Sequence, residues 1–103
     1  MSGNGNGPDS STSTDCKSLN IRTQIASPDP KVIATLSVGD LLKIVVKPPR
    51  GPATFVTKKG ETAGALLPGD LHQLIDCIND GYEYVGKVVS IKGANCQVLI
   101  KAK

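Results

Sequence analysis

The segment spanning residues 56–91 contains one strongly amphipathic helical pattern between two strand patterns, and it limits the folds open to this chain. Apolar side chains recur there at positions i, i+3, i+4 and i+7: Leu71, Leu74, Ile75 and Ile78. This spacing gives a helix one apolar stripe, which must pack against another element. We predict that Asp70 is the N-cap of this helix, with Gly69 as the alternative, and that Gly81 ends it in the left-handed conformation.

The rest of the chain is rich in strand patterns. Alternating or β-branched runs predict strands at residues 19–27, 41–47, 53–57, 82–92 and 96–101, with a further short apolar run at 63–67. Residues 31–36 fit either a helical turn or a short strand. Gly86 predicts a bend or bulge in the long strand. The predicted class is α+β, mostly β: a small, partly open β-barrel or curved antiparallel sheet of five or six strands with one amphipathic helix.

The N-terminal residues differ in composition from the remainder. Residues 1–18 are mainly Gly, Asn, Ser, Thr, Asp and Pro, with no large apolar side chain after Met1. Such a segment buries too little surface to offset its chain entropy. We therefore predict a disordered tail at 1–18 and a single β-rich domain at 19–103.

The three cysteines indicate a reducing environment. Cys16, Cys77 and Cys96 are odd in number and form no C-x-x-C motif, which argues against a disulfide framework. Reduced thiols and the absence of a secretory pattern predict a cytoplasmic protein. Lysines interrupt the most apolar run, so no membrane partner is expected.

Nothing in the sequence has the pattern of a catalytic or metal site. His72, the single histidine, lies off the apolar stripe of the helix, with no nucleophile or orienting partner beside it. Its spacing from Cys77 places the two on different helix faces, which disfavours zinc. Asp76 and Asp80 fit a solvated polar face. We expect no catalytic residue, no metal and no cofactor, and hence a protein that is not an enzyme.

The basic residues are the remaining candidates for a site. From residue 19 onward the chain carries eleven Lys and Arg against seven Asp and Glu. The candidates for phosphate contacts are Lys43, Lys47, Arg50, Lys58, Lys59, Lys87 and Lys92. Tyr82 and Tyr84 fall on one strand face and could stack on bases. The alternative, which we favour for at least one of them, is that the tyrosines close the core against the helix.

Three glycine-containing motifs resemble those of HIRAN domains. They are VGDxLxI at 38–44, VxxxGxxxGxLxP at 56–68 and GxxxxGxV at 81–88. HIRAN domains are small β-barrels with a helix, found alone in bacteria and fused to helicase-like enzymes elsewhere. The resemblance implies binding to single-stranded DNA or DNA ends. One segment departs from the family, because PPRGPA stands at 48–53 where HIRAN domains usually carry a segment with Asn and Asp.

Two functions of different classes follow. The first is a non-enzymatic module of HIRAN-like type that binds single-stranded DNA or DNA ends. The second is a protein-interaction or regulatory module that docks a partner through a sheet edge or through the proline-rich loop at 48–52.

Overall fold

The computed structural model describes residues 16–47 and 51–103. In these residues, six strands form one antiparallel sheet. The strands are β2 (Asn20–Gln24), β3 (Leu41–Val46), β4 (Ala53–Val56), β5 (Thr62–Ala65), β6 (Tyr84–Lys92) and β7 (Asn95–Ala102). The two named helices are α2 (Pro30–Ile33) and α3 (Pro68–Asn79). The predicted class and the predicted partly open barrel are confirmed.

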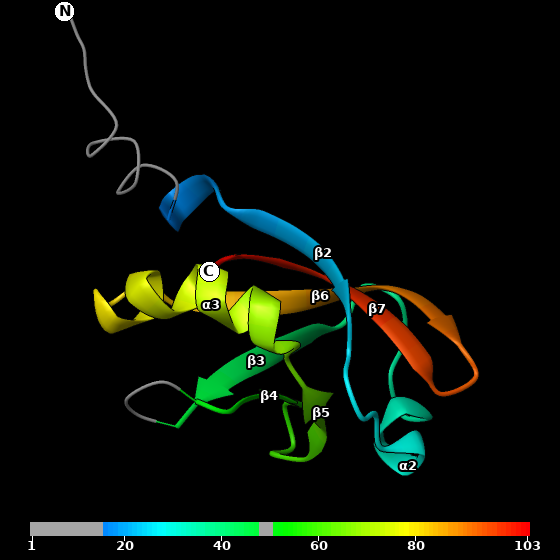
Figure 1. The fold of residues 1–103 in the computed structure, drawn as a ribbon. Coiled ribbons are helices and arrows are strands. Elements are labelled where there is room, and N and C mark those ends of the chain that lie inside the picture. Colours follow the sequence, from blue (N-terminus) through cyan, green and yellow to red (C-terminus); the bar gives the residue numbers. More distant parts are fainter. Residues whose placement is uncertain (1–15, 48–50) are drawn as a thin grey trace, which may run out of the picture.

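The sheet curls until its two outer strands approach each other. Its order is β2-β7-β6-β3-β4-β5 (Figure 1). The chain just after β2 then meets the end of β5, where the amide of Ala26 donates to the carbonyl of Ala65 over 2.8 Å and the reverse bond measures 2.9 Å. The amide of Asp29 donates to the carbonyl of Ala63. The barrel is therefore joined at this one place by a short backbone bridge.

Helix α3 lies across the concave side of the sheet (Figure 1). Leu74 and Ile75 of the predicted stripe are buried, and Leu71 and Ile78 are half-buried. Both predicted positions for the N-cap, Asp70 and Gly69, are wrong. Leu67 holds that position, and Asp70 lies inside the first turn, where its carboxylate accepts a hydrogen bond from Thr23 of β2. The carboxylate thus ties the helix to a strand instead of capping the helix.

The structure also decides the predictions for residues 31–36 and for Gly86. Residues 31–36 contain a helical turn, because α2 begins after Asp29, whose side chain accepts from the amide of Lys31. The irregularity predicted at Gly86 lies further along β6, between Val88 and Ser90. Gly86 has a different reason to lack a side chain: an added Cβ would lie 2.8 Å from the ring of Phe55.

A disulfide joins Cys16 to Cys77, which overturns the prediction of reduced thiols. Residues 16–18 form a helical turn, and Cys16 is only 3% exposed. The end of the predicted tail is therefore part of the folded domain, whereas residues 1–15 lie outside the described residues. A cytoplasmic location loses the support it drew from these cysteines, since disulfides persist in oxidising compartments.

Thiol counting tests this disulfide. We expect the native protein to present no thiol that reacts with Ellman's reagent. Cys16 and Cys77 are bonded, Cys96 is fully buried, and burial raises the pKa of its thiol. Denaturation without reductant should expose one thiol, and denaturation with reductant should expose three. Three thiols in denatured, unreduced protein would contradict the Cys16–Cys77 bond.

Candidate nucleic-acid interface

A groove opens where strands β3 and β6 separate. The two strands pair only over three residues, ending at Lys43 opposite Val85. Strand β3 then continues to Val46 with β4 as its partner, while the chain before β6 turns away toward the end of α3. The groove has a volume of about 740 Å³, within the range of about 300–1,000 Å³ typical of small-molecule sites.

Residues from both faces of the sheet line this groove. Ile44, Ile78 and Tyr84 reach it from the inner side of the barrel, and Lys43 and Val85 from the outer side. The inner side contributes an apolar floor. The outer side connects the groove directly to the exposed face of the sheet.

The two tyrosines have different roles. Tyr84 is buried, its hydroxyl donates to the carbonyl of Cys16, and burial, followed by the proximity of Tyr82, raises its pKa. It therefore closes the core, as we favoured for at least one tyrosine. Tyr82 precedes β6 and is half-buried, and its amide donates to the carbonyl of Cys77. The prediction that both tyrosines lie on one strand is wrong, because β6 begins only at Tyr84. Of the two tyrosines that line the groove, Tyr82 is therefore the one that is partly exposed to solvent.

Three cations line the groove: Lys43, Lys58 and Lys103. Glu83 is the single acid among the lining residues, and its carboxylate lies 3.3 Å from the amine of Lys103. Both of these side chains are largely exposed, so the ion pair contributes little and can exchange for another anion. The groove therefore combines an apolar floor, one available aromatic ring and an excess of positive charge.

A second set of predicted cations lies on the outer face of the sheet. Lys87 and Lys92 of β6 point outward, opposite Leu99 and Asn95 of β7. Two neighbours on the same face, Arg22 and Lys101, were not among the predicted site residues. The alternation of β2 and β7 already placed these side chains outside, but the order of the strands was needed to bring them beside Lys87.

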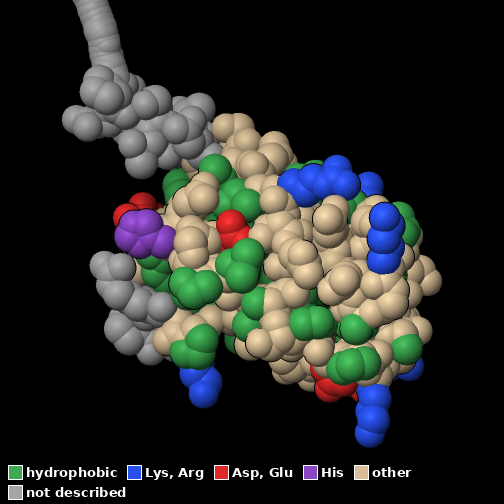
Figure 2. Space-filling view, turned by 45° about the vertical axis from the view of Figure 1, so that its right-hand side comes forward, with side chains coloured by type: hydrophobic (Ala, Val, Ile, Leu, Met, Phe, Trp, Pro, Cys, Tyr) green, Lys and Arg blue, Asp and Glu red, His purple; other side chains and the backbone are tan. Residues whose placement is uncertain are grey.

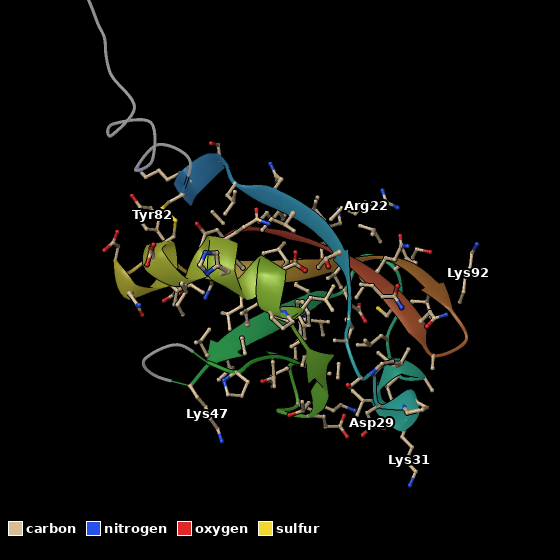
Figure 3. The ribbon with its side chains drawn as sticks, viewed as in Figure 1. Arg22, Asp29, Lys31, Lys47, Tyr82 and Lys92 are labelled. Carbon is tan, nitrogen blue, oxygen red and sulfur yellow. A yellow bond between two sulfur atoms is a disulfide. The ribbon has the colours of Figure 1, made fainter. Side chains whose placement is uncertain are left out.

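The remaining predicted cations are dispersed. Lys47 follows the end of β3. Figure 3 shows Lys47 and Lys92 at opposite ends of the molecule. Lys59 sits at the β4–β5 turn and borders a different, smaller pocket. Arg50 lies outside the described residues. Figure 2 accordingly shows Lys and Arg side chains at separate places along the border of the face that it presents.

The described residues offer no alternative centre built on metal ligands. They contain no group of three or more His, Cys, Asp or Glu that could hold a metal ion. His72 is exposed on α3, as expected. Among the helices of residues 16–47 and 51–103, none has the length and apolar character needed to cross a membrane.

Comparison with protein-family models, with curated proteins and with solved structures finds no match for this chain.

Proposed function

We propose that the protein is a non-enzymatic module that binds single-stranded DNA, with a terminal base in the groove between β3 and β6. The observation that carries this proposal is the composition of the groove. Tyr82 offers a ring for stacking, and Lys43, Lys58 and Lys103 line the same groove with positive charge. Base stacking on aromatic rings combined with lysine contacts to phosphates is the general chemistry of single-strand binding. The resemblance to HIRAN domains implies the same ligand.

Single-stranded DNA fits this groove better than a duplex does. The described part of the chain has one long helix, α3, which carries Asp76 on its exposed side and has Asp80 as its C-cap, so it is unsuited to enter a major groove lined by phosphates. The groove itself is a local opening in a small barrel. A flexible strand can place one base in it, whereas a paired base cannot leave its stack without an energetic cost.

Binding of oligothymidylate tests the proposal. We expect fluorescein-labelled dT10 to bind in low salt, and Tyr82→Ala to weaken binding by about tenfold, because stacking of one base contributes about 1–3 kcal/mol. Lys58→Glu should weaken it as well and should reduce the slope of log K against log salt by about 0.7 for the lost phosphate contact. Fluorescence anisotropy titrations at several salt concentrations measure both quantities.

Lys31→Glu is the matched control for Lys58→Glu. Lys31 is an exposed cation of α2 that does not line the groove, and Figure 3 shows it on the opposite side of the molecule from Tyr82. Its reversal changes the net charge by the same amount. If Lys58→Glu and Lys31→Glu lose the same affinity for dT10, the loss is due to net charge and not to a contact in the groove. Absence of dT10 binding by the wild-type protein in low salt would refute the proposed function.

The alternative function is docking of a protein partner through a sheet edge or through the loop at 48–52. One edge is already used, since Ala26 and Asp29 bond to the outer side of β5. Residues 48–50 lie outside the described residues. Partner capture from lysate that survives nuclease and moderate salt, and is lost when the loop is replaced, would favour this alternative.

A cytoplasmic location is part of the proposal, since single-stranded DNA is the proposed ligand. There the Cys16–Cys77 bond would meet a reducing environment. The stability of the reduced protein then matters for its function.

A further inference from the structure

Within the described residues, the strands of the sheet carry cations on their outer face and contain no acidic residue. None of the six strands in the described chain contains Asp or Glu. Five cations lie in these strands: Arg22, Lys43, Lys87, Lys92 and Lys101. All five occupy outward positions, because the residues that alternate with them are the buried or half-buried ones. The described acids instead lie in turns, in loops and on α3.

The strand register arranges four of these cations in a zigzag across the sheet. One row of paired residues runs Arg22, Leu99, Lys87, Leu41, and the next runs Asn20, Lys101, Val85, Lys43. Each cation is thus directly opposite an apolar or amide side chain and diagonal to the next cation. Diagonal neighbours in a sheet lie about 7–8 Å apart. The cations therefore avoid direct opposition to one another, and no acidic residue within the six strands neutralises them. The acid that precedes β6, Glu83, is paired with Lys103.

Two apolar side chains of β3 on this face are open to solvent: Leu41, opposite Lys87, and Val45, two residues beyond Lys43. Leu41 is 46% exposed and Val45 is 44% exposed. The guanidinium of Arg22 has a long contact with the amide oxygen of Gln97, at 3.4 Å, and forms no ion pair within the described residues. A surface with this composition is complementary to a chain that alternates anionic groups with less polar ones, as the phosphates and bases of a single strand do.

This face is continuous with the groove. Lys43, Leu41 and Val85 belong to the two outer rows and also line the groove. A strand that leaves the groove past Lys43 meets Lys87, Lys101 and Arg22 in turn as it crosses β6, β7 and β2. The residues therefore describe one path and not two separate sites.

We propose that this outer face, which we call the cation track (Lys43, Lys87, Lys101 and Arg22), binds the phosphates of the nucleotides that follow the base in the groove. The inference rests on the proposed function and specifies how much of the strand the protein holds. From β3 to β2 there are three strand spacings of about 4.8 Å, or about 14 Å. At about 3.4 Å per stacked nucleotide this path holds about four nucleotides. With the base in the groove, the full site is then about five nucleotides long, which dT6 spans.

The test is a length series of oligothymidylates on the full chain. Unlabelled dT2, dT4, dT6, dT8 and dT10 compete with labelled dT10, and we expect affinity to rise up to about dT6 and then to show only the statistical gain of longer chains. Arg22→Glu and Lys101→Glu should each weaken dT6 binding by about tenfold and lower the salt slope by about 0.7. They should leave dT2 binding unchanged. Lys31→Glu, with the same change of net charge, should leave the whole length series unchanged.

The outcomes separate this inference from the proposed function. If dT2 binds as tightly as dT6, or if the two track variants bind dT6 like wild type, the cation track is wrong while binding in the groove stands. If no oligonucleotide of any length binds in low salt, the proposed function fails with it. Two further ligands test other occupants of this face: vesicles that contain phosphatidylserine, for a lipid surface, and polyglutamate, for an acidic protein. Binding to either that is lost in Arg22→Glu and Lys101→Glu, with dT6 binding intact, would assign the face to a lipid surface or an acidic protein and overturn the inference.

Discussion

Replacement of both Cys16 and Cys77 by alanine is expected to lower the free energy of unfolding by about 4 kcal/mol. The disulfide closes a loop with a sequence separation of 61 residues, and a cross-link of this length removes about that much chain entropy from the unfolded state. The loss is large against the 5–15 kcal/mol typical of a domain. Denaturant titration should show a lower midpoint, and thermal unfolding a decrease on the order of 20 °C.

Reduction of the wild-type protein supplies the control. Dithiothreitol should lower the stability of the wild type to that of the double alanine variant, and it should leave the variant unchanged because Cys96 has no partner with which to form a bond. If neither reduction nor substitution moves the unfolding midpoint, the bond does not stabilise the domain. The comparison also gives the stability of the reduced form, which is the form expected in a reducing compartment.

The disulfide matters for the groove as well as for stability. The carbonyl of Cys16 accepts from the hydroxyl of Tyr84, and the carbonyl of Cys77 accepts from the amide of Tyr82. Both tyrosines line the groove. Sequence patterns could not reveal this arrangement, because cysteines 61 residues apart carry no spacing motif and their number is odd.

The helix and the strands were predictable because their periods are local. The stripe from Leu71 to Ile78 requires only neighbouring residues to be read, and the observed helix places it against the core. The error at Asp70 has the opposite origin. Its carboxylate is bound by Thr23, a residue 47 positions earlier in the chain. Only the tertiary structure brings that hydroxyl to the helix and assigns Asp70 its role.

The candidate site was predictable in part for the same reason. Lys43 and Lys87 were both among the predicted phosphate contacts, and the pairing of β3 with β6 makes them diagonal neighbours. Strand alternation could not identify Arg22 and Lys101 as site residues. Local sequence does not show that β7 and then β2 lie next to β6 in the sheet. The separation of β3 from β6, which creates the groove, likewise depends on where the pairing of two distant segments stops.

Closure of the barrel provides the second large expected effect. Gly64 of β5 packs so closely on the chain after β2 that an added Cβ would lie 2.2 Å from Cγ2 of Ile25 and 2.7 Å from the carbonyl oxygen of Ala26. Ile25 is fully buried and the Ala26 carbonyl accepts the bond from the amide of Ala65, so neither atom can move without separating the bridge. We expect Gly64→Ala to lower the free energy of unfolding by about 3 kcal/mol, as measured by denaturant titration.

Hydrogen exchange locates this effect, and a second glycine controls for it. Amide protection should fall at Ala26 and Ala65, whose reciprocal bonds join the two outer strands, while the pairing of β6 with β7 retains its protection. Gly69 lies in the first turn of α3, and an added Cβ there meets no atom within 4 Å. Gly69→Ala should therefore leave stability unchanged or raise it by up to about 1 kcal/mol. Equal stability of the two variants would mean that the close approach at Gly64 does not hold the barrel together, and that the sheet keeps its curvature through α3 and the core alone.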